Sequence, residues 1–340
     1  MKQFIVAPAP HAHGSDSVRK NMLLVILALV PAYAVSVWQF GIGALITAAI
    51  SILACVGTEW LISRFVLKEK RQTIGDLSAV LTGLLLAFNL PSSIDWWIVL
   101  IGAVVAIGVG KMTFGGLGQN PFNPALVGRV FLLISFPAQM TTWPVAKHFD
   151  TSYLDAETGA TPLYYLKHML DKNAPMAERL GSVKSITEIE WWDYLSGAMG
   201  GSLGEVCALA LILGGIILIC TKTITWHIPV SIIATVALFA ACLGWAGMVP
   251  DGMETYQFVG YELLTGGLML GAFFMATDYV TSPMTAWGKI IFGIGIGVLV
   301  MVIRTWGAYP EGMSFAILIM NACVPLLNKI RPTRFGEKKK

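Results

Sequence analysis

A short polar segment at residues 154–163 carries the residue types that an enzyme could modify covalently. It reads Leu-Asp-Ala-Glu-Thr-Gly-Ala-Thr-Pro-Leu and brings carboxylates, two threonines and a glycine into a largely apolar chain. Gly159 permits a positive φ, and Pro162 biases Thr161 toward an extended backbone. We therefore expect the Thr161 hydroxyl to be presented on an open, approachable strand. An ordinary polar turn is the alternative that these residues leave open.

The composition excludes a water-soluble globular protein. Of the 340 residues, 56% are hydrophobic and only 13% are charged, whereas soluble domains carry about 25% charged residues. Apolar runs recur from Leu23 to Leu327, which is typical of a polytopic helical membrane protein. The formal charge of +3 is small, and the basic residues form no patch interleaved with aromatic residues, so nucleic-acid binding is not predicted.

The apolar runs predict ten transmembrane helices, each spanning roughly 20 residues. The expected helices cover residues 22–40, 42–66, 77–92, 95–112, 122–140, 203–221, 227–246, 258–279, 287–304 and 312–328. The third is short and ends at Asn89-Leu90-Pro91, and Gly-Gly and Asn-Pro steps at the junctions break helical hydrogen bonding. Such breaks usually mark a functional interior.

Lysine and arginine are concentrated on one side of this topology, which the positive-inside rule assigns to the cytoplasm. The residues counted on that side include Arg64, Lys111 and Lys222. Both termini are then cytoplasmic. The predicted organisation is a cytoplasmic lead (1–21), a first membrane region of five helices (22–140), an extracytoplasmic loop (141–202), a second membrane region of five helices (203–328) and a basic cytoplasmic tail (329–340).

Two weak matches relate the halves of the chain. Leu81-Thr82-Gly83-Leu84 corresponds to Leu264-Thr265-Gly266-Gly267, and Thr113-Phe114-Gly115 corresponds to Thr305-Trp306-Gly307. If each half has five helices, an odd number, the second half must enter the membrane upside down. The predicted fold class is therefore an all-α integral membrane protein with ten transmembrane helices in two inverted five-helix repeats and an extracytoplasmic loop region.

The polar segment resembles the flavinylation motif, Asp-x-x-Ser/Thr-Gly-Ala-Thr, of a family of membrane proteins. These are the B subunit of the sodium-pumping NADH:quinone oxidoreductase and the D subunit of the Rnf ferredoxin:NAD oxidoreductase. Five residues match the motif position by position: Asp155, Thr158, Gly159, Ala160 and Thr161. The likeness extends to residues 75–83, 114–125, 271–278 and 309–312 and so covers most of the chain. The short polar lead before Leu23 is more similar to the Rnf relative.

The resemblance implies a covalent FMN, held by a phosphoester to Thr161 and attached by a flavin transferase. It also implies a second, non-covalent flavin, riboflavin, within the membrane part. The implied partners are the other Rnf subunits: the membrane iron–sulfur subunits, the extracytoplasmic FMN subunit and the subunits on the cytoplasmic NADH and ferredoxin side. The chain would lie in a bacterial cytoplasmic membrane and couple electron transfer to outward movement of Na⁺ or H⁺.

The sequence itself contains no catalytic site for NAD or ferredoxin. It shows neither a Gly-rich dinucleotide fingerprint nor a cysteine cluster for iron–sulfur, and no metal site is predicted from its five scattered cysteines. The expected role is thus that of a relay subunit in an ion-translocating oxidoreductase. Three alternatives remain open: the quinone-reducing relative, a flavin-free solute channel or transporter, and a structural scaffold for a membrane assembly.

The run Gln119-Asn120-Pro121-Phe122-Asn123-Pro124-Ala125 admits two interpretations. An asparagine N-cap followed by proline could simply begin the fifth helix. Alternatively, the broken backbone and the amides of Asn120 and Asn123 could offer donors and acceptors to the second flavin or to a dehydrated cation.

Arg129 falls inside the fifth expected helix, where an unpaired arginine in hydrocarbon costs several kcal/mol. We expect it to face the interior of the bundle and to pair with an acidic residue. Five acids lie within or at the boundary of the expected spans: Glu59, Asp76, Glu205, Glu262 and Asp278. No single one of them can be assigned as an ion ligand from the sequence.

Overall fold

The computed structural model describes most of the chain. The described residues are 17–68, 74–146, 153, 158–159, 161–170, 191–197, 200–205, 207–249, 253–309 and 311–330. Five residues of the polar segment, 154–157 and 160, lie outside this set, and they include Asp155 and Ala160. The first 16 and last 10 residues lie outside it as well.

The described residues are almost entirely helical. The first half contains α1 (Val18–Phe40), α2 (Ile42–Leu61, continued by a π-helical turn Ile62–Val66), α3 (Ser78–Phe88), α4 (Trp96–Val104, continued by a π-helical turn Val105–Val109) and α5 (Pro124–Ser135). The second half contains α10 (Ala208–Cys220), α11 (His227–Trp245), α12 (Thr255–Leu264), α13 (Leu268–Leu270, continued by a π-helical turn Gly271–Met275), α14 (Ala286–Trp306) and α15 (Met313–Leu327).

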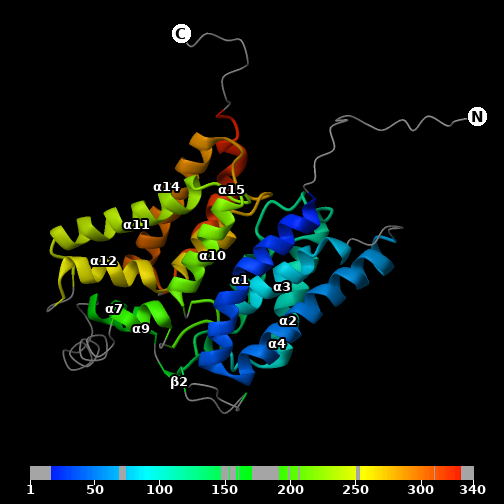
Figure 1. Cartoon of the computed structure of the whole chain (residues 1–340), viewed down its shortest axis with the longest axis horizontal. Helices are drawn as coiled ribbons and strands as arrows, with labels where there is room; N and C mark the ends of the chain where they lie inside the picture. The colour runs from blue at the N-terminus through cyan, green and yellow to red at the C-terminus, as the bar shows by residue number, and fades with distance from the viewer. Residues whose placement is uncertain are drawn as a thin grey trace, which may run out of the picture.

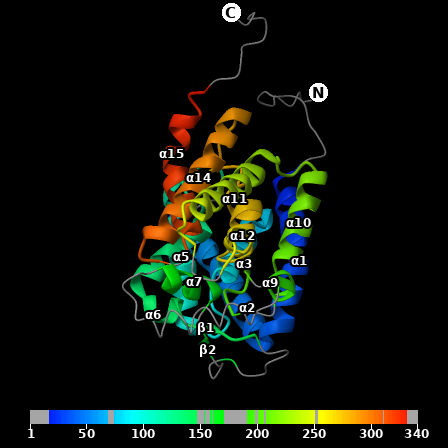
Figure 2. The same cartoon turned by 90° about the vertical axis from the view of Figure 1, so that its left-hand side faces the viewer.

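Short elements connect the two halves. They are α6 (Pro137–Met140), β1 (Trp143–Pro144), β2 (Thr158–Gly159), α7 (Pro162–Leu170) and α9 (Trp191–Ser196). The strands pair antiparallel, with Trp143 opposite Gly159 and Pro144 opposite Thr158. The hairpin β1–β2 and helices α7 and α9 lie at one end of the molecule, whereas α1 begins and α15 ends at the other (Figure 1 and Figure 2).

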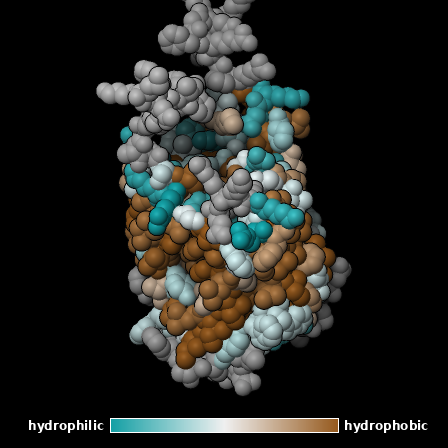
Figure 3. All heavy atoms as spheres, turned by 90° about the vertical axis from the view of Figure 1, so that its right-hand side faces the viewer, coloured by the Kyte–Doolittle hydropathy of each residue, from teal (hydrophilic) through white to brown (hydrophobic). Residues whose placement is uncertain are grey.

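By length and composition, five helices of the described chain could cross a membrane, or six if the bent pair of α12 and α13 is one span. Four shorter apolar helices, α3, α5, α10 and α15, complete the bundle. Figure 3 shows a broad hydrophobic surface on the outside of this bundle with hydrophilic residues at one end. Large apolar side chains such as Leu53 and Phe65 of the α2 segment contribute to the exposed surface, 71% and 63% exposed. The coarse prediction of a multi-pass helical membrane protein is therefore confirmed, and the count of ten spans stays a prediction.

Each of the ten expected spans contains a helix, and three of them depart most from their expected bounds. The span expected at 122–140 ends at Ser135, because Pro137 cannot continue the helix through Phe136. The span expected at 203–221 begins only at Ala208. The span expected at 258–279 is broken into α12 and α13, which meet at an angle of 58°. Gly266 and Gly267 lie at this break, and their φ angles of +66° and +64° are incompatible with a continuous helix.

Packing within each half follows one pattern. Helix α2 packs against α3 and α4, and α11 packs against α12 and α14. Helices α1 and α10 contact each other and join the halves. Close approach of α2 and α3 depends on Gly83, since a Cβ there would lie 2.7 Å from the Cα of Ile52. The bundle core is thus built from small residues that let backbones approach, as is usual in membranes.

We expect Gly266→Ala to destabilise the bundle strongly. Alanine at a φ of +66° costs about 1–2 kcal/mol, and its Cβ would also collide with Leu163 Cδ2 at 2.8 Å and with the Arg304 guanidinium. The matched control is Gly57→Ala in α2, where nothing lies within 4 Å of an added Cβ and a gain of up to about 1 kcal/mol is expected. The midpoint of unfolding by sodium dodecyl sulfate in mixed micelles measures both variants. Equal midpoints would contradict this account of the break.

Candidate functional site

A cavity of about 520 Å³ opens beside the hairpin β1–β2, and we call it the hairpin cavity. Its volume is ample for a cofactor. Residues from five elements and from the turn before α15 line it: Arg129, Leu133, Met140, Thr141, Thr142, Trp143, Thr158, Gly159, Thr161, Tyr164, Ala308, Tyr309 and Glu311. The fold thus brings Thr158, Gly159 and Thr161, three of the five motif residues, into the wall of one cavity.

Thr161 does not lie on an open strand, so that prediction was wrong. It is 4% exposed and precedes α7, where its Oγ1 accepts a hydrogen bond from the backbone N–H of Tyr164 at 3.2 Å. Pro162 occupies the first helical position, and threonine followed by proline is a favoured start of a helix. The hydroxyl therefore sits at a helix N-terminus, where the helix dipole and the free backbone N–H groups favour a phosphate group.

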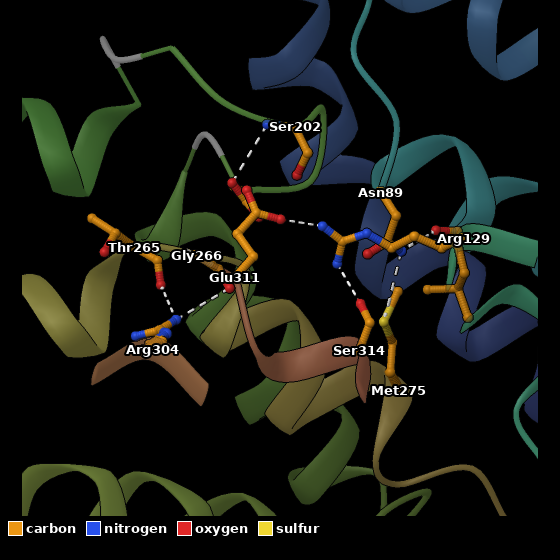
Figure 4. Close-up of polar contacts among 11 residues, drawn as sticks. Asn89, Arg129, Ser202, Thr265, Gly266, Met275, Arg304, Glu311 and Ser314 are labelled. Carbon is orange, nitrogen blue, oxygen red and sulfur yellow. Dashed lines mark hydrogen bonds and ion pairs between the residues drawn. The ribbon is translucent and has the colours of Figure 1, made fainter. Parts of the chain in front are cut away.

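Two charged residues, Arg129 and Glu311, line the hairpin cavity. Arg129, on α5, is 4% exposed and faces the interior as expected, but its partner is Glu311 and not one of the five acids considered from the sequence. Ser314 accepts a second hydrogen bond from the same guanidinium (Figure 4). The Arg129 Nε has no hydrogen-bond partner, so one buried donor is available to a polar ligand.

Aromatic side chains form another part of the hairpin cavity. Trp143, Tyr164 and Tyr309 line it, and Tyr309 stacks on Phe315 with 5.4 Å between ring centroids. Aromatic faces of this kind suit a planar heterocyclic ring. Together with the buried hydroxyl, the helix N-terminus and the unpaired Arg129 donor, they fit an FMN joined to Thr161 through its phosphate.

A second buried arginine holds the broken helix α12–α13. Arg304, near the end of α14, donates from Nη1 to Glu262 Oε2 at 2.7 Å and to the Glu262 carbonyl at 2.6 Å. Its Nη2 donates to the carbonyls of Thr265 and Gly266 at 2.9 and 3.2 Å (Figure 4). These carbonyls lie at the break between the helices, so the arginine supplies partners that a continuous helix would otherwise provide.

A second cavity, of about 70 Å³, opens near the start of α1, and we call it the asparagine cavity. Asn120 and Asn123 both line it. Asn123 is the N-cap of α5, with its Oδ1 accepting from the Ala125 N–H at 3.1 Å, and its Nδ2 donates to the Met275 carbonyl at 3.2 Å. Asn120 Nδ2 donates to the Phe122 carbonyl at 2.9 Å. The capping interpretation is confirmed for Asn123. Asn120 and Asn123 also line the cavity, where a ligand could contact them.

Lys111 also lines the asparagine cavity and is only 2% exposed. Its Nζ donates to Glu59 Oε2 at 2.7 Å and to Ser78 Oγ at 2.6 Å. Ser78 is the first residue of α3. The short helices α3 and α5 thus both begin at this cavity, beside a buried cation.

Most acids singled out from the sequence have structural partners. Glu59 and Glu262 pair with Lys111 and Arg304. Asp76 Oδ1 accepts from the Ser78 N–H at 2.8 Å, and Asp278 Oδ2 accepts from Thr281 Oγ1 at 3.2 Å. Within the described chain, no group of three or more histidine, cysteine, aspartate or glutamate residues could hold a metal ion.

Sequence reasoning missed two groups: Glu311 as the partner of Arg129, and Arg304 as the residue that holds the helix break. Both are charged residues at the edge of an apolar run, where a snorkelling group is the simpler expectation. Their pairing depends on contacts between residues 182 and 42 positions apart in the chain. In the sequence, the signal for these roles was a charged residue near a predicted helix break.

The described part of the chain is a helical bundle in which five or six apolar helices are long enough to cross a membrane, and this defines a multi-pass membrane protein. The chain belongs to the NQR2, RnfD, RnfE family, whose model matches residues 5–336. It is 43% identical to the D subunit of the Na⁺-translocating ferredoxin:NAD⁺ oxidoreductase complex of Acetobacterium woodii, over 97% of this chain and 94% of that protein. It is also 43% identical to the D subunit of the proton-translocating ferredoxin:NAD⁺ oxidoreductase complex of Clostridium ljungdahlii, over 99% of this chain and 97% of that protein.

A third relative is the D subunit of the ion-translocating oxidoreductase complex of Escherichia fergusonii, 38% identical over 99% of both chains. All three names place the relatives in multi-subunit complexes. The resemblance drawn from the motifs is therefore confirmed at the level of the family.

We expect Arg304→Met to destabilise the bundle by about 3–5 kcal/mol, because it leaves the Glu262 carboxylate buried without a countercharge. The carbonyls of Thr265 and Gly266 lose their donors in the same variant. The control is Lys289→Met, also on α14, whose Nζ makes one exposed hydrogen bond to Thr225 Oγ1 and for which a change within about 0.5 kcal/mol is expected. Detergent unfolding midpoints measure the difference, and a stable Arg304→Met protein would contradict the role given to this arginine.

Proposed function

We propose that the chain is the membrane electron-carrier subunit of an Rnf-type ferredoxin:NAD oxidoreductase, with FMN bound covalently to Thr161. The main observation behind this proposal is that Thr161 combines two properties. It is the last residue of a flavinylation motif, and it lies at a helix N-terminus in the wall of a cofactor-sized cavity. The names of relatives that align over nearly the whole chain support the same assignment.

Within this proposal, each part of the hairpin cavity has a role toward FMN, which when bound supplies a redox-active ring. The start of α7 stabilises the negative charge of the phosphoester through the helix dipole. Trp143, Tyr164 and Tyr309 would line the space around the ring, and the unpaired Nε of Arg129 would offer the bound group a hydrogen bond. Because the phosphate forms the linkage, the ring itself stays free of the covalent bond.

The asparagine cavity is proposed to hold the second, non-covalent flavin, riboflavin. Asn120 and Asn123 present amide groups there, which suit the carbonyl and nitrogen atoms of the ring. The Lys111 ammonium in the same cavity is paired with Glu59. Helix α5 connects the two cavities, since Asn123 lines one and Arg129 lines the other. Six residues of helix separate them, a rise of about 9 Å, which is short enough for an electron relay.

The inverted-repeat topology with ten spans is part of the proposal, and a local correspondence supports it. Leu77 and Gly267 both adopt the left-handed conformation, with φ of +65° and +64°, immediately before the short helices α3 and α13. In each half, a buried cation at the end of the fourth helix reaches this break: Lys111 bonds Ser78, and Arg304 bonds Gly266.

The ends of the bundle support the predicted orientation in a bacterial cytoplasmic membrane. Because α1 begins and α15 ends opposite the hairpin (Figure 1), cytoplasmic termini would place Thr161 on the outer side, where covalent attachment prevents loss of FMN. The proposed partners are the membrane iron–sulfur subunits, the extracytoplasmic FMN subunit, the cytoplasmic NADH and ferredoxin-side subunits, and the flavin transferase during maturation.

Redox energy is sufficient for the proposed ion translocation. Moving one charge against about 150 mV costs roughly 3.5 kcal/mol, which two electrons release on falling through about 75 mV. The transported ion is Na⁺ or H⁺, since relatives of equal identity carry either name. The quinone-reducing B subunit is the second candidate, because it belongs to the same family.

The covalent flavin is tested by denaturing electrophoresis of the chain co-expressed with its flavin transferase. We expect a fluorescent band under ultraviolet light that disappears in Thr161→Ala and persists in Thr161→Ser, because serine keeps the hydroxyl. Thr142→Ala is the matched control, since it removes a threonine that lines the same cavity but lies outside the motif, and it should keep most of the fluorescence. A dark wild-type band would overturn the electron-carrier proposal and favour a channel or transporter.

The second flavin is tested by quantifying flavin released on acid denaturation, which leaves the covalent FMN on the chain. We expect Asn120→Ala and Asn123→Ser to reduce released riboflavin at least several-fold, while the fluorescent band at Thr161 is unchanged. Serine preserves the N-cap of α5, so loss in this variant reports on the amide and not on the helix. Wild-type release of riboflavin from both variants would place the second flavin elsewhere.

A further inference from the structure

Glu205 is a buried carboxylate that the proposed function does not use. It belongs to the loop 200–205, which precedes α10. Two backbone hydrogen bonds join this loop to the end of α3: the Leu203 N–H donates to the Leu90 carbonyl at 3.2 Å, and the Gly204 N–H donates to the Phe88 carbonyl at 2.7 Å. The Glu205 side chain is 7% exposed. Its Oε2 accepts only a long hydrogen bond, 3.5 Å, from the Ser202 N–H, and its Oε1 has no hydrogen-bond partner.

Glu205 lines a small cavity of about 10 Å³ beside Thr161. Thr161, Glu311, Thr265 and Gly266 also line this space. Thr161 and Glu311 also line the hairpin cavity, so these two residues are shared by both cavities. The residues Ser202, Gly266 and Glu311 lie around this position in Figure 4.

The charges around the small cavity do not balance. Glu311 comes from the turn before α15, Arg129 from α5 and Arg304 from α14, and all three act electrostatically on Glu205. Arg129 is already paired with Glu311, and Arg304 with Glu262 of α12. The nearby cation of α7, Lys167, donates to the Gly307 carbonyl, and burial lowers its pKa. Glu205 is therefore the carboxylate without a countercharge among the described residues of this cluster.

The surroundings of Glu205 favour a proton over a metal cation. A bound Na⁺ would need several oxygen ligands and would sit beside two guanidinium groups, whose charge repels it. A proton forms an O–H bond with the single free oxygen, removes the buried charge and needs no further ligand. Water-excluded carboxyl groups near like charges favour this form in general.

We propose that Glu205 is a redox-linked proton-binding site that responds to charge on the group carried by Thr161. An electron from a low-potential one-electron donor adds a negative charge beside the small cavity. One proton from water then forms an O–H bond with Glu205 Oε1, and this bond breaks when the electron leaves. The proposal rests on the flavinylation of Thr161, and it assigns to Glu205 a charge-compensating role on the same side of the bundle.

The test is a redox titration of the covalent flavin with dithionite in the purified, flavinylated complex at several pH values. Because negative charge strengthens proton binding, the midpoint potential falls as pH rises through the range in which Glu205 titrates. One proton for each electron corresponds to about 59 mV per pH unit. We expect Glu205→Gln to reduce this slope, and Glu254→Gln, which changes an exposed carboxylate at the start of α12, to leave it unchanged.

Infrared difference spectra supply a readout that a purely structural role would not change. Reduced-minus-oxidised spectra of the wild type should contain a protonated carboxylic-acid C=O band that shifts in D₂O and is absent from Glu205→Gln. If the glutamine variant fails to assemble, Glu205→Asp, which keeps a carboxyl group, should retain the pH slope and shift the position of the band.

The outcomes separate the two proposals. A dark band on the gel overturns the flavin at Thr161. A fluorescent band with equal slopes in wild type and Glu205→Gln overturns the role of Glu205 alone, as does a carboxylic-acid band that is unchanged in both Glu205 variants. A midpoint potential that depends on Na⁺ and not on pH would also overturn it, because the site would then bind a metal cation.

Discussion

A helix that breaks inside an apolar layer must find partners for its freed backbone groups within the protein, and this constraint organises the second half of the bundle. The carbonyls of Thr265 and Gly266 point away from any helical donor, and Arg304 reaches them from α14. An arginine buried there needs a countercharge, which Glu262 supplies. The break, the cation and the acid are therefore one structural unit, because removing any one of them leaves the others buried without a hydrogen-bond or charge partner.

The same logic ties the two cavities to the bundle. At the asparagine cavity, Lys111 joins Glu59 of α2 to the first residue of α3. At the hairpin cavity, Arg129 joins α5 to the segment before α15. Each buried pair fixes helices from different parts of the chain around a cavity, so the ligand sites and the packing of the bundle depend on the same contacts. A polar group that packing leaves unsatisfied, such as Arg129 Nε or Glu205 Oε1, is then available for function.

Helix existence was the most predictable property. All ten expected spans contain a helix, because long apolar runs have few alternatives in a membrane. The break at Phe136 and the cap at Asn123 follow from proline and asparagine chemistry that acts over three or four residues. The division of the helix into α12 and α13 was harder to predict from the sequence, since Gly266 and Gly267 permit a left-handed backbone but do not require it. Only the contact with Arg304 makes that conformation the stable one.

The sequence by itself determined that the chain is a helical membrane protein, which family it resembles, that Arg129 faces inward and that Thr161 belongs to a modification motif. These depend on composition, local capping chemistry and short motifs, which act between near neighbours. Only the tertiary structure decided that Glu311 is the partner of Arg129, that Thr161 caps α7 in a cavity wall, and that Glu205 stands without a countercharge. These pairings join residues far apart in the chain, and their choice depends on how the helices pack and on which buried charges come within reach of one another.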